Sequence, residues 1–241
     1  MTMLRVNYWG QLRESIAHRG KAIPRIGGVV TLVATSVTLY ILAALLIVPS
    51  DAAREFNFVN ERGAVTALSA VFLAMASGLA GAAFFLSRGE PARQRGFWLL
   101  TTFGFGFLAL DELLQFHERV GRLLVRLQLS PELFRNGSDT VVVVYGIGAL
   151  ALLAYFLPAV LRHSRLPELL GVALFFFVLH TVIDSTQEPP TSLSIILEES
   201  AKLFCGAFLA LAAFAGLLAV VSSKQHDYAQ SGLSRPRLRE Q

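Results

Sequence analysis

Six long apolar stretches dominate the sequence and constrain its fold more than any other feature. They are residues 27–49, 64–87, 96–116, 140–161, 167–185 and 193–221. A helix needs about 20 apolar residues to cross the hydrocarbon core of a bilayer. The third and fifth stretches reach that length only if polar residues at their C-terminal ends lie inside the protein. The sequence therefore predicts an all-α fold, a polytopic membrane bundle of six transmembrane helices.

The composition excludes the main alternatives to a membrane protein. Of the 241 residues, 54% are hydrophobic and only 16% are charged, whereas soluble domains carry about a quarter charged residues. This balance excludes a disordered chain, a coiled coil and an ordinary cytosolic enzyme. The single cysteine excludes a disulfide framework and a cysteine-rich zinc or iron–sulfur site.

The distribution of charge predicts the orientation of the bundle. Of the 21 Lys and Arg residues, 14 fall in the N-terminal segment, the second-to-third loop, the fourth-to-fifth loop and the C-terminal tail. Twelve of the 17 Asp and Glu residues fall on the opposite side. Because Lys and Arg accumulate in cytoplasmic loops, we expect a multi-pass protein of the bacterial inner membrane with both termini in the cytoplasm. The basic charge is thus a topology signal and does not indicate nucleic-acid binding. The expected partners are the lipid bilayer and either a second copy of the chain or a larger membrane complex.

The segments outside the spans divide the chain into three parts. Residues 1–26 mix apolar and aromatic residues with arginines, which predicts a cytoplasmic helix at the membrane surface. Residues 27–221 form the six-helix domain, and the polar tail 222–241 is predicted to be disordered. Residues 117–129 are amphipathic and are predicted to continue the third span along the outer membrane surface. No cleavable signal peptide is evident, so the first span is expected to stay in place.

Ionisable residues gather at the outer ends of the spans. The third span ends with Asp111, Glu112, His117 and Glu118, and the fifth ends with His180 and Asp184. The sixth begins with Glu198, Glu199 and Lys202, and Glu61 precedes the second. The six-span topology brings all of these residues to the same leaflet. An ionisable group at this depth costs several kcal/mol unless it is paired, so each one is a functional candidate.

Helical spacing predicts which of these residues share a face. At about 100° per residue, Asp111, Gln115, Glu118 and Arg122 form one stripe, and His117 points elsewhere. His180 and Asp184 share a face of the fifth span. Glu198, Lys202 and Cys205 share a face of the sixth. Three helices can therefore present polar groups to one interior site.

Carboxylates with imidazoles are the ligands of zinc, manganese or iron. The leading hypothesis is a divalent metal site in a membrane-embedded enzyme at the outer leaflet. Its ligands are expected to be His180 and Asp184, completed by members of a wider set: Asp111, Glu198, Glu199, His117 and Glu61. Glu112 is a further ligand candidate. We predict Glu118 as a carboxylate for general acid/base catalysis, and Glu112 as a second catalytic candidate.

The same residues are compatible with other functions, and the sequence alone does not decide whether the protein is an enzyme. The same carboxylates could bind ions in transit through a transporter or a proton-coupled carrier. They could also form a purely structural network in an accessory subunit, with Glu198 and Lys202 neutralising each other four residues apart. His117 and His180 are also candidate axial ligands of a b-type haem.

Two short motifs carry a resemblance to other proteins. One is the Leu-Asp-Glu…His-Glu pattern within residues 108–119, and the other is the Glu-Glu…Gly pattern within residues 198–206. Together they resemble a group of small multi-pass bacterial membrane proteins that are uncharacterised. The relatives have a second acid where this chain has Lys202, a difference that weighs against a fully carboxylate metal cage. The resemblance implies no activity.

Overall fold

A computed structural model describes residues 2–17, 26–47, 63–129, 137–186 and 192–233. These residues form eight helices, and no strand occurs among them. In chain order the helices are α1 (Thr2–Ala17), α2 (Ile26–Ile47), α3 (Ala64–Leu86), α4 (Ala92–Leu114), α5 (Phe116–Arg126), α6 (Gly137–Leu161), α7 (Leu166–Thr186) and α8 (Ser192–Leu233). The all-α fold class is confirmed.

Six of the helices, α2, α3, α4, α6, α7 and α8, are long and apolar enough to cross a membrane. Their bounds agree with the six predicted spans to within a few residues, except at the C-terminal end of α8, which extends beyond the predicted span. Proline and glycine set the boundaries: Pro91 caps the start of α4, and Gly89 has a φ of 91°, a conformation that residues with a side chain rarely adopt. The chain is therefore an integral membrane protein with multiple spans.

The surface of the bundle is apolar over much of its area. The exposed fractions of Leu46, Phe103 and Leu32 are 86%, 69% and 66%. On a soluble protein, apolar side chains exposed to this degree would favour aggregation. In lipid they cost nothing, because the acyl chains are as apolar as the side chains themselves.

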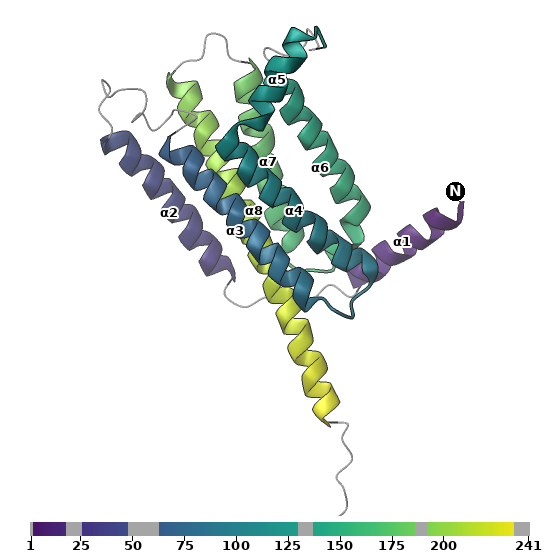
Figure 1. The fold of residues 1–241 in the computed structure, drawn as a ribbon. Coiled ribbons are helices and arrows are strands. Elements are labelled where there is room, and N and C mark those ends of the chain that lie inside the picture. The colour runs from purple at the N-terminus through teal and green to yellow at the C-terminus, as the bar shows by residue number, and fades with distance from the viewer. Residues whose placement is uncertain (1, 18–25, 48–62, 130–136, 187–191, 234–241) are drawn as a thin grey trace, which may run out of the picture.

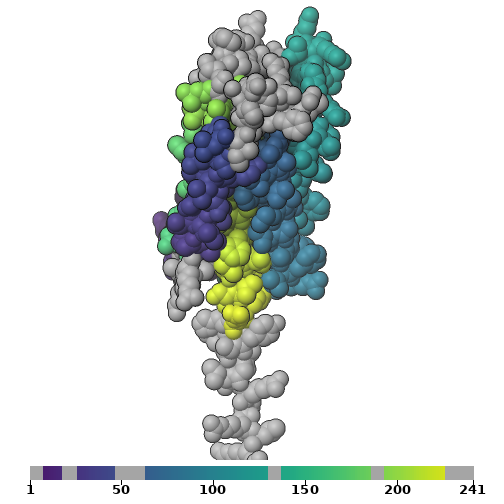
Figure 2. Space-filling model, turned by 90° about the vertical axis from the view of Figure 1, so that its left-hand side faces the viewer, coloured from purple at the N-terminus to yellow at the C-terminus, as the bar shows by residue number. Residues whose placement is uncertain are grey.

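Helix α8 forms the centre of the bundle and packs against α3 on one side and α7 on the other (Figure 1). Alanines line its buried face, and α3 faces it with alanines of its own, including Ala76 and Ala80. Small residues let two helix backbones approach closely, which is how membrane helices gain packing energy. Helix α2 lies at the outside of the bundle against α8, as Figure 2 shows from a second direction.

The two ends of the bundle differ in structure. At one end, called the α1 end, α1 packs against α6 and the hydroxyl of Tyr8 donates to the Ala154 carbonyl oxygen at 2.8 Å. The Arg93 guanidinium lies over the rings of Tyr8 and Tyr155 and donates to Gln11. At the opposite end, called the α5 end, the short helix α5 packs against the start of α6 (Figure 1). The backbones of Gly121 and Gly137 meet there so closely that a side chain at either position would overlap the other chain segment.

Two expectations about helix ends differ from the structure. The helix predicted over residues 117–129 is present as α5 (Phe116–Arg126). It does not continue the third span as expected, because α4 ends at Leu114 and Gln115 adopts a left-handed φ of 53°. Helix α5 then starts in a new direction. The polar tail was predicted to be disordered from residue 222, whereas α8 continues as far as Leu233. Residues 234–241 lie outside the described part of the chain.

Candidate functional site

A cavity of about 450 Å³ lies within the bundle between α4, α6, α7 and α8. Its polar end, at the α5 end of the bundle, is lined by Asp111, Glu112, His117, Glu118, Asp139, Asp184, Glu198 and Lys202. Its apolar end, toward the α1 end, is lined by Phe97, Trp98, Phe156, Leu166 and Leu170. These eight residues and His180 therefore bring ionisable groups into one cavity with an apolar floor.

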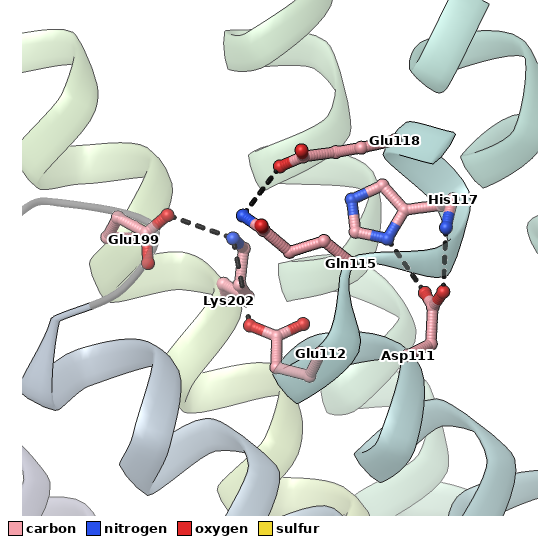
Figure 3. A network of polar contacts seen from close by, with 7 residues as sticks. All are labelled: Asp111, Glu112, Gln115, His117, Glu118, Glu199 and Lys202. Carbon is pink, nitrogen blue, oxygen red and sulfur yellow. Dashed lines mark hydrogen bonds and ion pairs between the residues drawn. The ribbon is translucent and has the colours of Figure 1, made fainter. Parts of the chain in front are cut away.

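The clearest interaction at the polar end joins Asp111 and His117. The Asp111 carboxylate is buried, with 5% of the residue exposed. Its Oδ2 lies 2.8 Å from Nδ1 of His117, and its Oδ1 accepts the His117 backbone N–H at 2.8 Å. Figure 3 shows the second ring nitrogen of His117 pointing away from the carboxylate. Because the carboxylate accepts the proton on Nδ1, the neutral imidazole keeps a lone pair on Nε2.

The turn between α4 and α5 produces this pair. An uninterrupted helix would separate Asp111 and His117 by about 120° around its axis. The left-handed conformation of Gln115 ends α4 and folds His117 back over the last turn. Asp111 then satisfies one of the backbone N–H groups that every helix leaves unpaired at its start, in this case that of α5.

Several neighbours act on the pKa of His117, which lies outside the membrane-spanning helices. Partial burial lowers the pKa, because the charged imidazolium loses hydration. The hydrogen bond to Asp111 and its negative charge raise the pKa, and Glu112 adds to this effect while Lys202 opposes it. The net result is a pKa above the ordinary value of histidine, set mainly by Asp111.

Lys202 forms the second group of contacts at the polar end (Figure 3). Its Nζ donates to Oε1 of Glu199 at 2.9 Å and lies 3.8 Å from Oε1 of Glu112. Both carboxylates are largely buried, and within the described residues Glu112 Oε1 and Glu199 Oε2 have no hydrogen-bond partner. The sequence left open an ion pair of Lys202 with Glu198; the ion pairs that Lys202 forms here are with Glu199, three residues away, and with Glu112 from another helix.

Glu118 belongs to a third group. Gln115 Nε2 donates to its Oε1 at 2.8 Å, and Arg122 Nη1 donates to its Oε2 at 3.1 Å. Part of the expected stripe of Asp111, Gln115, Glu118 and Arg122 is therefore present. Asp111 does not join it, because the break at Gln115 turns Asp111 toward His117 instead.

The remaining candidates lie around the same cavity. His180 and Asp184 of α7 and Glu198 of α8 line its polar end. The His180 ring packs edge-on against Phe177 at 5.2 Å. Glu61 falls outside the described residues. In the portion of the chain that the structure describes, no three His, Cys, Asp or Glu side chains come close enough together to hold a metal ion.

Sequence reasoning missed two features of this site. It placed His117 away from Asp111, since no residue type between them marks a left-handed turn. It also did not anticipate that Trp98 and Phe156 would line the far end of the cavity. The signal that could have suggested an apolar end of the cavity is the set of apolar residues that share one face of the third and fourth spans.

Comparison with known proteins gives one match. No curated protein and no solved structure matches the chain. The sequence pattern of a domain of unknown function, DUF8692, matches residues 26–218, which include the first five spans, most of the sixth and every described site residue. This agrees with the resemblance to an uncharacterised family. The chain belongs to the DUF8692 family.

Proposed function

We propose that the protein is a membrane-embedded enzyme in which Nε2 of His117 removes a proton from the reacting group. The observation that carries this proposal is the 2.8 Å contact between Asp111 and His117 at the polar end of the cavity. A buried carboxylate on Nδ1 fixes the tautomer and orientation of the imidazole, as a general base requires. The reaction class that needs least further machinery is hydrolysis of an ester or amide by a water that His117 deprotonates.

Other polar groups have supporting roles in this proposal. The Lys202 ammonium, held by Glu199, supplies positive charge for an oxygen that becomes negative during the reaction. Glu112 and Glu118 remain candidate catalytic carboxylates, because both line the cavity beside His117. Glu118 already accepts from Gln115 and Arg122, so Glu112 is the more available of the two for substrate.

Hydrolysis of chromogenic acyl esters by the protein in lipid nanodiscs tests this proposal. General acid–base groups contribute about 10²- to 10⁴-fold to rates, so His117→Gln should reduce kcat/KM by a factor in that range. Asp111→Asn should reduce it by a smaller factor. His163→Gln, a histidine substitution at the α1 end, is the matched control and should retain activity. Equal activity in wild type and His117→Gln would refute the proposal.

A divalent metal, zinc, iron or manganese, is the second candidate. It is favoured by the presence of His180, Asp184 and Asp111 around one cavity, with His117 nearby. Water or substrate would have to complete the coordination, because the described residues supply no three-ligand group. Elemental analysis of wild type and of a His180→Ala, Asp184→Ala variant separates the candidates. Near-stoichiometric metal lost in the variant would support the metal site. Folded samples without metal would support the metal-free mechanism.

No specific observation favours the other two roles, an ion carrier and an accessory subunit. An ion carrier needs polar groups along the whole path, whereas Phe97, Trp98 and Leu166 line the apolar end of this cavity. An accessory subunit has no need for a cavity of this volume. Flux measurements in liposomes and co-purification of a partner protein would reveal these two roles.

We further infer the orientation in a bacterial inner membrane. The α1 end carries the described basic residues Arg88, Arg93, Arg95, Arg162, Arg165 and Lys224. Positive charge of this density favours the cytoplasmic side. The polar end of the cavity would then open toward the outer leaflet.

A further inference from the structure

The cavity changes character along its length in a way that suits one class of molecule. Asp111 and Trp98 lie on the same helix, about 20 Å apart along its axis at 1.5 Å per residue. This distance exceeds half of the hydrocarbon core, which is about 30 Å thick. The cavity therefore runs from the boundary of the membrane deep into its interior, with charged residues only toward the boundary.

A hydrocarbon chain is the ligand that such an interior would bind. Apolar side chains gain by contact with apolar ligand surface, and the volume of about 450 Å³ lies in the lower part of the range of small-molecule sites. This volume fits one chain better than two. A molecule with a polar head at the α5 end and one chain toward Trp98 would also match the depth profile of the surrounding lipid.

The charges at the polar end restrict the head of that molecule. Six carboxylate side chains line it, against the three basic side chains of Lys202, His117 and His180. One of the six, Glu118, is paired with Arg122, so five carboxylates face these three groups. Lys202 is already paired with Glu199 and Glu112. An anionic head would therefore meet unfavourable like charge. Glu112 Oε1 is a buried acceptor without a hydrogen-bond partner in the described structure, so a head with a hydroxyl or amine donor could satisfy it.

We propose that this cavity binds a single-chain amphiphile whose head donates hydrogen bonds and carries no negative charge, with its chain ending among the apolar residues that cover the buried Trp98. The identity of the head as substrate rests on the proposed function of His117. Binding of the chain does not, because it depends only on the shape and lining of the cavity.

Quenching of tryptophan fluorescence by bromine tests the chain position. The protein has two tryptophans, Trp9 and Trp98, so Trp9→Phe leaves Trp98 as the only fluorophore. This variant is placed in nanodiscs of unbrominated phosphatidylcholine and titrated with dibrominated stearoyl glycerol. We expect saturable quenching of Trp98 by the glycerol ester and by dibrominated stearylamine, and much weaker quenching by dibrominated stearate.

Two leucine substitutions provide the matched controls. Gly104 lines the cavity between Asp111 and Trp98, and Gly148 in α6 is not among the lining residues. A Cβ atom at either position meets no heavy atom within 4 Å, so both substitutions should fold. Gly104→Leu should abolish the saturable quenching, and Gly148→Leu should preserve it. Quenching that persists in Gly104→Leu would show contact from the surrounding lipid and overturn the proposal.

The same samples separate this inference from the proposed function. His117→Gln should retain the quenching of Trp98 even though it loses hydrolysis. If Trp98 is quenched but no hydrolysis depends on His117, binding of the amphiphile is supported and the catalytic role is refuted. If hydrolysis depends on His117 but Trp98 is not quenched, the catalytic role is supported and binding of the amphiphile is refuted. Equal quenching by the stearate probe would overturn the restriction on head charge.

Discussion

The contact between Asp111 and His117 shows how one side chain can set the chemistry of another. A histidine this close to lipid would ordinarily lose its proton, since burial disfavours the imidazolium. Asp111 more than reverses that effect through a hydrogen bond and a negative charge. The histidine is thereby kept in one orientation and made more basic, and both properties would serve a general base.

Replacing this carboxylate should move the titration of His117. In Asp111→Asn the hydrogen bond and the charge that raise the pKa of His117 are lost, while burial still lowers it. The titration midpoint should therefore shift to lower pH. NMR of the His117 ring protons in detergent micelles, from pH 5 to pH 9, measures the shift. A midpoint that does not move would show that Asp111 has no influence on the imidazole.

His163, at the α1 end, presents the opposite case. Only 6% of the residue is exposed, and its ring lies 5.6 Å from that of Trp98. Burial, assisted by the charge of Arg162, lowers the pKa of His163 to about 4. In the unfolded chain the same group would titrate near 6.5.

Acid should therefore destabilise the protein through His163. Between pH 6.5 and pH 4 the unfolded chain binds a proton at His163 more readily than the folded protein does. The free energy of unfolding is therefore unaffected by His163 above this interval and falls as the pH drops through it. The loss amounts to roughly 3 kcal/mol at pH 4. Thermal unfolding of wild type and His163→Phe at several pH values measures it. Parallel pH dependence in the two proteins would contradict the assignment.

At the scale of helices, close approach governs the packing. Gly216 of α8 faces Trp98 of α4, and a Cβ atom at Gly216 would overlap the indole ring. Trp98 is fully buried, so it has little room to withdraw. Through this contact the indole of α4 reaches α8, and it lies at the apolar end of the cavity.

Adding a methyl group at this contact should be costly. Gly216→Ala should destabilise the protein by about 1–3 kcal/mol, the usual cost of overpacking. Gly78→Ala in α3 is the matched control, because a Cβ atom there meets nothing within 4 Å. It should be neutral or stabilise by up to about 1 kcal/mol, the difference in helix propensity. Equal melting temperatures for the two variants would argue against a tight contact between Gly216 and Trp98.

At the scale of the whole molecule, the described residues hold six helices that could span a membrane, and if each one crosses it, an even number would bring both ends of the bundle's chain to one side. Basic residues cluster at the end of the bundle where α1 lies, and the polar end of the cavity lies at the other. A protein built in this way presents its candidate chemistry to one leaflet only.

Reporter fusions test the orientation. Green fluorescent protein fused after residue 241 should fluoresce, because it folds in the cytoplasm, and alkaline phosphatase at the same place should be inactive. Alkaline phosphatase inserted after residue 129, at the α5 end, should be active, since the positive-inside rule places that end outside. The reverse pattern would invert the topology and move the polar end of the cavity to the cytoplasmic leaflet.

The sequence by itself determined the six spans, their approximate ends and the gathering of acids at one end. These properties depend on the length and polarity of continuous segments, which neighbouring residues specify without help from the rest of the fold. Residues such as Asp111, His180 and Glu198 could therefore be assigned to one end of the bundle before any contact was known.

Only the tertiary structure decided which of these residues meet. A left-handed turn at Gln115 joins Asp111 to His117, although regular helical spacing would separate them. Lys202 selects Glu199 and Glu112 over Glu198 because α4 and α8 bring Glu112 within reach. Helix spacing describes positions along one element, whereas these pairings depend on where a helix breaks and on which neighbour it faces.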